Sequence, residues 1–166
     1  MAGTETIEQV FPYQTFQCTG AFMPEPIPGA EKILIVEDDS IIAVTIEGRL
    51  KEFGYRVVGR VATGAEAIKK ALELEPDLVL MDIHLKGPID GIEAAETIYG
   101  IHNIPVVYLT AFSDEATLER ANKTSPFGYI VKPFSDSTLK TTLRLAILKH
   151  SAEKKDSERE DLMIWE

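Results

Sequence analysis

Acidic side chains that end two apolar runs are the residues of this chain best suited to chemistry. Asp82 follows a run of four apolar residues, and the cluster Glu37–Asp39 follows the run Ile33–Val36. In an open parallel α/β sheet, sites form at the carboxyl ends of the strands. Because acids that converge there repel one another unless a cation lies among them, the sequence predicts a metal-dependent aspartate site. The other role for such acids is to cap the next helix, for which Asp39 or Ser40 is well placed.

The composition limits the class of protein that can carry such a site. The chain has 166 residues, of which 45% are hydrophobic and 8% aromatic, which suffices for one well-packed domain with extensions. Its formal net charge is -10, and its sequence contains no basic run. Since a phosphate backbone would be repelled by this charge, we expect no direct contact with nucleic acid.

Cysteine usage and hydropathy predict where the protein works. A single cysteine, Cys18, excludes an intrachain disulfide and a cluster of thiolate ligands built from one chain. The first 31 residues contain no lysine or arginine, and no 18-residue apolar segment occurs in the sequence. These features argue against a secretory signal and against insertion into a membrane. We therefore expect a cytoplasmic protein.

Strand-like and helix-like patterns alternate from residue 32 onward. Apolar side chains recur at helical spacing between the strand-like runs, and Ser135 is placed to cap a fifth helix. Continuously apolar strands are typical of a parallel sheet covered by helices on both faces, so the predicted fold class is a doubly wound α/β fold of the (βα)₅ type. The five predicted strands lie near residues 33–36, 56–61, 78–81, 105–109 and 128–131.

Two segments of different composition flank this alternating region, which spans residues 32–149. Residues 1–31 contain four prolines and four aromatic side chains, so we expect an N-terminal extension that is mobile, folds back on the domain or meets a partner. Residues 150–166 form a tail of good helix formers that ends in the apolar group Leu162–Trp165. That group either frays or is covered by its own domain, a second copy or a partner.

Five short motifs follow one another in this region in chain order. They are Ile33–Asp39, Leu80–Asp82, Asp90–Gly91, Leu109–Ala111 and Lys132–Phe134. Together they resemble the receiver domain of two-component response regulators, and the resemblance covers residues 32 to about 149. It implies a flavodoxin-like fold with five parallel strands in the order 2-1-3-4-5.

The resemblance implies a role for each acid. Asp82 would be the phosphoacceptor, which takes a phosphoryl group from a histidine kinase or a phosphotransfer protein and forms an acyl phosphate. A divalent ion that bridges the carboxylate and the phosphoryl group would offset their charges, and Mg²⁺ is the expected cofactor. Asp38 would bind it directly and Glu37 through water. The implied ligands are Glu37, Asp38, Asp82 and the backbone carbonyl of His84.

Three further residues match positions that act on the phosphoryl group or transmit its presence. Lys132 would pair with the phosphoryl oxygens, directed inward by a cis Lys132-Pro133 peptide bond. Thr110 would bond a phosphoryl oxygen, and Tyr129 would turn inward when Thr110 moves. This shift would change a protein-binding face formed by the fourth helix, the fifth strand and the fifth helix.

The chain departs from the common pattern in two places. The loop Ile83–Gly91 is one residue longer than usual and resembles a receiver subtype found with sensory kinases and in archaea. Because of the extra residue, the sequence does not predict how the chain enters the following helix. Phe112, two positions after Thr110, has no polar group that could orient an attacking water, so we expect slow self-dephosphorylation.

The resemblance implies a single-domain response regulator. Its partners would be the phosphoryl donor and a downstream protein target or a partner response regulator, and too few residues follow the fifth helix for a DNA-reading output domain. We expect no enzymatic activity beyond self-catalysed phosphoryl transfer and dephosphorylation. A homodimer could form through the face of the fourth helix, fifth strand and fifth helix, or through the C-terminal tail.

Four other functions stay open from the sequence. The same fold could act as a phosphate shuttle or sink in a phosphorelay, or as a phosphorylation-independent scaffold. A hydrolase of the haloacid-dehalogenase type would share the acyl phosphate, but it usually carries Asp-x-Asp after its first strand, whereas Asp82 follows the third. A flavodoxin would share the fold, yet Glu37–Asp39 would repel the flavin phosphate. Turnover of a substrate would identify the hydrolase, and a yellow purified protein would identify the flavodoxin.

Overall fold

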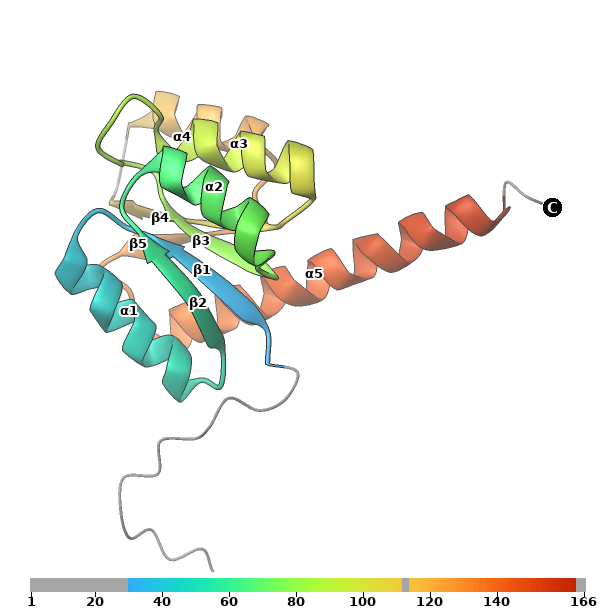
Figure 1. Cartoon of the computed structure of the whole chain (residues 1–166), viewed down its shortest axis with the longest axis horizontal. Coiled ribbons are helices and arrows are strands. Elements are labelled where there is room, and N and C mark those ends of the chain that lie inside the picture. The colour runs from blue at the N-terminus through green and yellow to red at the C-terminus, as the bar shows by residue number, and fades with distance from the viewer. Residues whose placement is uncertain (1–29, 112–113, 164–166) are drawn as a thin grey trace, which may run out of the picture.

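Five strands and five helices alternate along the chain in a computed structural model that describes residues 30–111 and 114–163 (Figure 1). Predictions about Phe112, about Trp165 and about all but the last two residues of the N-terminal extension lie outside the described residues. The strands are β1 (Lys32–Val36), β2 (Arg56–Val61), β3 (Leu78–Asp82), β4 (Val106–Ala111) and β5 (Gly128–Lys132). The helices are α1 (Ser40–Glu52), α2 (Gly64–Leu74), α3 (Gly91–His102), α4 (Glu115–Lys123) and α5 (Asp136–Met163).

The strands form one parallel sheet in the order β2-β1-β3-β4-β5, which confirms the predicted fold class. The switch in strand order lies between β1 and β3, where chain connections leave in opposite directions from neighbouring strands. In such sheets the crevice beyond the carboxyl ends of these two strands is the place for a site. The acidic residues after β1 and at the end of β3 therefore meet at the switch point.

Two apolar layers hold the sheet between its helices. Leu34 and Val36 of β1 pack on the side of α2, α3 and α4, whereas Ile33 and Ile35 pack on the side of α1 and α5 (Figure 1). Successive side chains of a strand point to opposite faces, so β1 and β3 are buried on both. This double burial explains why the strands are continuously apolar in sequence rather than alternating.

The turns that lead from strands into helices fix the edge of the sheet where the acids lie. The Asp39 carboxylate accepts hydrogen bonds from the backbone N–H groups of Ile41 and Ile42 at 2.9 and 3.2 Å, so Asp39 caps α1. At Gly91, a Cβ atom would lie 1.9 Å from the carbonyl oxygen of Asp82. Only glycine therefore lets α3 begin directly against the end of β3.

Helix α5 continues through residues 150–163 of the tail, which the sequence predicted to be good helix formers. It runs for 28 residues, so the predicted boundary between domain and tail at residue 150 lies inside one continuous helix. The Ser135 hydroxyl accepts a hydrogen bond from the backbone N–H of Thr138 at 3.1 Å, as a capping residue does. Residues 151–163 are all exposed, and Figure 1 shows this part of α5 leaving the body of the domain.

Candidate functional site

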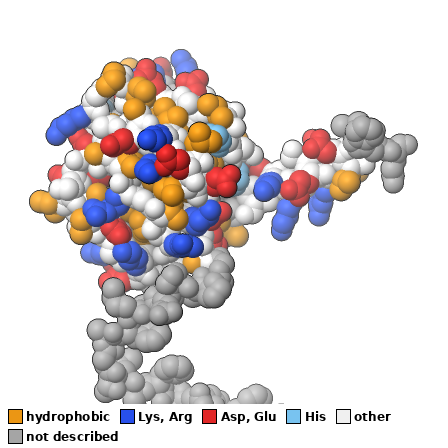
Figure 2. All heavy atoms as spheres, in the orientation of Figure 1, with side chains coloured by type: hydrophobic (Ala, Val, Ile, Leu, Met, Phe, Trp, Pro, Cys, Tyr) orange, Lys and Arg blue, Asp and Glu red, His pale blue; other side chains and the backbone are white. Residues whose placement is uncertain are grey.

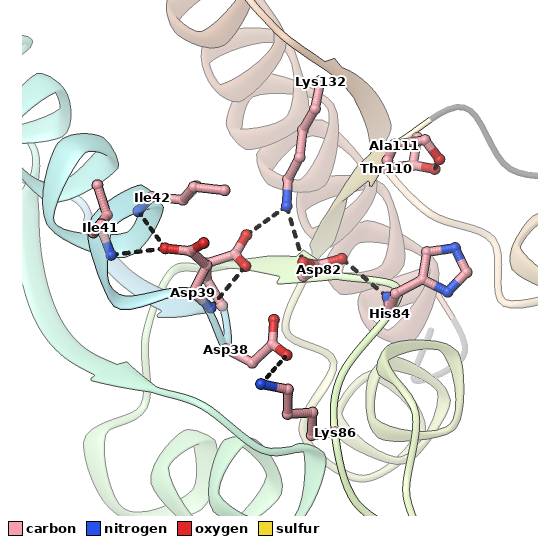
Figure 3. Close-up of polar contacts among 11 residues, drawn as sticks. Asp38, Asp39, Ile41, Ile42, Asp82, His84, Lys86, Thr110, Ala111 and Lys132 are labelled. Atoms are coloured by element: carbon pink, nitrogen blue, oxygen red, sulfur yellow. Dashed lines mark hydrogen bonds and ion pairs between the residues drawn. The ribbon is translucent and has the colours of Figure 1, made fainter.

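The carboxyl ends of β1, β3 and β5 bring three acids and one lysine together (Figure 3). Glu37 and Asp82 are buried, with 3% and 5% of their surfaces exposed, and Asp38 is half-buried beside them. One carboxylate oxygen from each of these acids lies within 4.8 Å of the other two. The structure therefore assembles the acidic cluster that the sequence predicted at this edge.

Lys132 links two of the acids across the site. Its Nζ donates hydrogen bonds to Glu37 Oε2 at 2.6 Å and to Asp82 Oδ2 at 2.9 Å. The Lys132-Pro133 peptide bond is cis, as predicted. The lysine side chain is itself only 18% exposed, so water screens these ion pairs less than it would at the surface.

The electrostatics of the site show an excess of negative charge. Burial raises the pKa of Glu37 to about 7, and the charge of Asp82 adds to the rise, although the hydrogen bond from Lys132 opposes it. For Lys132, burial alone would lower the pKa, but hydrogen bonds to Glu37 and Asp82 outweigh it and raise the pKa above its ordinary value. One ammonium thus only partly offsets three carboxylates, and a divalent cation would relieve the rest.

Both oxygens of Asp82 are held in place. Oδ2 accepts from Lys132, and Oδ1 accepts a hydrogen bond from the backbone N–H of His84 at 2.9 Å. These two contacts fix the orientation of the carboxylate, which is what a nucleophile in a group transfer needs. The role of the His84 carbonyl as a metal ligand stays a prediction.

Asp38 differs from the other two acids because Lys132 does not bind it. Its charged neighbour is Lys86, whose Nζ lies 3.9 Å from Asp38 Oδ2 and whose side chain is 87% exposed. Lys86 belongs to the lengthened loop between β3 and α3, and the sequence offered no motif that could have identified it as part of the site. This contact is weak, so Asp38 is the most available of the three acids.

Thr110 lies next to the site on the neighbouring strand. Asp82 of β3 pairs in register with Leu109 of β4. Thr110 therefore lies one residue further toward the carboxyl end of the sheet than Asp82. It is 2% exposed, and its hydroxyl donates a hydrogen bond to the carbonyl oxygen of Ala111 at 3.0 Å (Figure 3). The sequence placed Thr110 at the end of β4, and its role as a switch stays a prediction.

Tyr129 contacts α4 through its hydroxyl. The hydroxyl donates a hydrogen bond to Asn122 Oδ1 at 2.7 Å, and its ring centroid lies 5.8 Å from that of Tyr108. The hydroxyl of Tyr108 in turn shares a hydrogen bond of 2.7 Å with the hydroxyl of Thr124. Burial raises the pKa of both tyrosines, that of Tyr108 to about 12. No pattern in the sequence indicated that Asn122 and Thr124 bind these two tyrosines.

A third contact joins α4 to the lengthened loop. Arg120 donates a hydrogen bond to Asp90 Oδ2 at 2.8 Å, while the other carboxylate oxygen of Asp90 caps α3. Although burial opposes it, hydrogen bonds from the Glu93 N–H and from Arg120 lower the pKa of Asp90. The loop that the sequence marked as unusual is therefore tied to both α3 and α4.

A family model of the response regulator receiver domain matches residues 33–144. The chain belongs to this family. The family is that of the response regulators of two-component signalling, and the acidic site is consistent with phosphorylation-based signalling. This membership decides against the hydrolase and flavodoxin alternatives. Within the described residues, none of the helices is long and apolar enough to cross a membrane.

The proteins similar to this chain include a longer protein and a receiver domain of nearly the same extent. The transcriptional regulatory protein PdtaR of Mycobacterium tuberculosis is 40% identical over 116 residues, which are 70% of this chain and 56% of that protein. The chain thus spans about half the length of this relative. The signal receiver domain of a modulated diguanylate cyclase from Desulfovibrio desulfuricans G20 is 38% identical, with a TM-score of 0.72 over 75% of this chain and 98% of that one.

A third similar protein was solved with a metal. The receiver domain of the sensor histidine kinase PA1611 from Pseudomonas aeruginosa PAO1 has a magnesium ion coordinated in its active site cleft. It is 32% identical, with a TM-score of 0.65 over 71% of this chain and 98% of that chain.

Proposed function

We propose that this receiver accepts a phosphoryl group on Asp82 from a histidine kinase or a phosphotransfer protein, in a reaction that requires Mg²⁺. The observation that carries the proposal is the buried Asp82 carboxylate, which lies within 4.8 Å of two other carboxylates and is bound by Lys132 at 2.9 Å. Such a cluster is costly to bury unless it serves a cation and a reaction.

The transfer proceeds by attack of an Asp82 carboxylate oxygen on phosphorus. A P–O bond forms, the P–N bond of the donor phosphohistidine breaks, and the imidazole leaves with the electron pair and takes up a proton. The N–H of His84 and the ammonium of Lys132 orient the carboxylate before the attack. Since Lys132 already contacts the acceptor, its ammonium is close enough to stabilise negative charge on the incoming phosphoryl oxygens.

Three acids and one backbone carbonyl would hold the magnesium ion. The chemistry that Mg²⁺ would supply there is neutralisation of the negative charge that the carboxylates and the incoming phosphoryl group bring together. We assign Asp38 as a direct ligand because it has only a weak, exposed partner, whereas Glu37 is bound to Lys132 and would act through water. The magnesium ion in the active site cleft of the similar receiver domain of PA1611 supports the choice of metal. The remaining ligands would be Asp82 and the carbonyl of His84.

We propose that the output is a changed protein-binding face rather than a chemical product. Tyr129 links β5 to α4 through its hydrogen bond to Asn122, so a change at Thr110 that moves Tyr129 would also move α4. The partner of this face would be a downstream protein or another response regulator. That the protein works in the cytoplasm, that it does not contact nucleic acid directly, and that it has no other enzymatic activity stay predictions.

Incubation of the full chain with acetyl phosphate, followed by intact mass measurement, tests the proposal. We expect one added phosphoryl group in the presence of Mg²⁺, and none in EDTA or in Asp82→Asn. The matched control is Asp39→Asn, because Asp39 is an acid of the same loop that caps α1 and lies outside the three-acid cluster. No metal-dependent modification of the wild type would favour the phosphorylation-independent scaffold.

Two further measurements separate the finer alternatives. Beryllofluoride should shift the NMR signals of Tyr129 and Asn122 if the site communicates with α4. Rapid transfer of the phosphoryl group onward to a histidine phosphotransfer protein, without such shifts, would favour a shuttle or sink. We also expect slow loss of the phosphoryl group from the isolated chain, as predicted from Phe112, and a half-life of seconds would contradict that expectation.

A further inference from the structure

Helix α5 has two faces with different surroundings. The inner face packs on the sheet through Leu139, Leu143 and Ala146, which are all fully buried. It continues to His150, whose ring lies edge-on to Phe127 with 5.5 Å between the ring centroids. This face is therefore already covered by the body of the domain.

The opposite face of α5 carries a second set of apolar side chains. Leu145 and Leu148 are 61% and 58% exposed, although they lie in the part of α5 that packs on the domain. Leu162, near the end of the helix, is 73% exposed. Six positions at alternating spacings of three and four residues form one continuous stripe, as in a coiled-coil seam. We call this the outer stripe, and its residues are Leu145, Leu148, Ala152, Lys155, Arg159 and Leu162.

The second half of the outer stripe lies on helix that has no support from its own domain. Residues 151–163 are all exposed, and Figure 2 shows them projecting as an arm from the compact body. An isolated helix of this length is marginal in water. Exposed leucines at both ends of the stripe and an unsupported helix between them indicate that another helix packs along it.

The charges along α5 determine what kind of helix fits. Residues 144–155 carry four basic side chains and one acidic one, whereas residues 156–163 carry four acidic side chains and one basic one. The two halves therefore have formal charges of opposite sign and equal size. The basic group is Arg144, Lys149, Lys154 and Lys155, and the acidic group is Asp156, Glu158, Glu160 and Asp161.

We propose that the outer stripe binds a second copy of this chain with the two α5 helices antiparallel. In that orientation the basic half of each helix lies along the acidic half of the other. At each end of the helix pair, Leu145 of one copy contacts Leu162 of the other. At the centre of the pair, Ala152 of one copy contacts Lys155 of the other. A parallel pair would place Lys155 on Lys155 and Arg159 on Arg159, with like charges side by side along the whole arm.

Charged residues at the centre of the stripe make this a reversible contact. Lys155 and Arg159 can cover apolar surface with their aliphatic stems but keep their charged ends in water. We therefore expect a dimer that dissociates on dilution and weakens as salt is added. The interface does not use Asp82 or its neighbours, so its failure would leave the proposed phosphoryl transfer untouched.

Sedimentation of the full chain over a range of concentrations tests the interface. We expect the wild type to dimerise, and Leu148→Lys and Leu162→Lys to shift the dissociation constant at least tenfold toward monomer. The matched control is Leu72→Lys, because Leu72 is a leucine on α2 that is 60% exposed, and this variant should dimerise like the wild type. Circular dichroism checks that each variant stays folded. A monomeric wild type would overturn the proposal. So would dissociation constants of Leu148→Lys and Leu162→Lys that both equal that of the wild type.

Disulfide trapping tests the orientation. Cys18 is first replaced by serine, and Leu145→Cys and Leu162→Cys are prepared separately, one of them isotopically labelled. We expect a mixed disulfide between the two variants on oxidation, detected by intact mass. A disulfide between two copies of Leu162→Cys, without the mixed product, would show a parallel pair and overturn the antiparallel arrangement.

Discussion

The acidic edge of the sheet and helix α4 both contact β5, through Lys132 and Tyr129, but are held in place by different forces. At the acidic edge, Lys132 joins Glu37 and Asp82, and the side chains of these three residues are between 1% and 18% exposed. In helix α4 one residue, Ala121, is buried, and the others are half-buried or exposed. The first region is fixed by burial, and the second by polar contacts at its surface.

Among the described residues, three side-chain hydrogen bonds tie α4 and its C-cap residue Thr124 to the rest of the domain. Arg120 binds Asp90 in the loop before α3, while Asn122 and Thr124 bind the hydroxyls of two tyrosines on β5 and β4. A neutral hydrogen bond of this kind contributes about 1 kcal/mol, because folding exchanges bonds to water for bonds within the protein. A change of charge at the acidic edge therefore costs much free energy, whereas a movement of α4 costs little. A phosphorylation switch needs both properties.

The largest effect should come from crowding the acidic edge. Gly91→Ala places a Cβ atom 1.9 Å from the carbonyl oxygen of Asp82, so β3 and α3 must move apart. We expect a loss of several kcal/mol, about 3 or more, in the free energy of unfolding. Urea denaturation measures it.

Gly100→Ala is the control for this substitution. Gly100 lies in the same helix, α3, but a Cβ atom there would meet nothing within 4 Å. Alanine should stabilise the helix by up to about 1 kcal/mol through its higher helix propensity. Equal effects of the two substitutions would contradict the tight packing of α3 against the end of β3.

The next effect is a pH dependence that arises from Glu37. In the metal-free protein its pKa is raised from 4.5 to about 7, so folding favours the protonated acid. This contribution to stability is fully present below pH 4.5 and is lost as the pH rises through about 7. The shift corresponds to about 3 kcal/mol. Unfolding free energies measured in EDTA should therefore fall over this pH range, and the fall should be smaller in Glu37→Gln.

Magnesium should reverse this trend. A cation that binds ionised carboxylates competes with protons, so Mg²⁺ should stabilise the protein more as the pH rises. Thermal unfolding with Mg²⁺ and with EDTA at several pH values measures the difference. Asp39→Asn should keep the full magnesium effect, because Asp39 caps α1 outside the cluster. A magnesium effect independent of pH would mean that Glu37 does not titrate in the site.

The smallest effects on stability should come from the contacts of α4. Tyr129→Phe and Asn122→Ala each remove one side of the same hydrogen bond, and each should lower the free energy of unfolding by about 1 kcal/mol or less. Both should speed amide hydrogen exchange in α4 while leaving phosphorylation of Asp82 by acetyl phosphate unchanged. Because the two substitutions break one bond, the double variant should equal the single ones.

Arg120→Ala provides the comparison for these variants. It breaks a contact on the other side of α4, where the arginine side chain is 51% exposed. Its effect on stability should be smaller still, because water screens an exposed ion pair. Slowed exchange in α4 after any of the three substitutions would contradict the view that these contacts hold the helix.

Much of the fold could be predicted because the signals are local. Runs such as Ile33–Val36 are continuously apolar, which a strand buried on both faces requires, and each predicted strand agrees with the structure to within two residues. The length of α5 was also available from the sequence. No glycine or proline occurs between residues 136 and 163 to end the helix, and the tail of good helix formers continues it.

By itself the sequence determined the sheet, the acids at its edge and the identity of Lys132, since strand patterns and short motifs depend on neighbouring residues. Only the tertiary structure decided that Lys132 binds Glu37, 95 residues away in the chain, and that Asn122 holds Tyr129. It also decided which face of α5 stays open. The physical reason is that such contacts depend on the packing of whole elements, which fixes distances between side chains that no local pattern records.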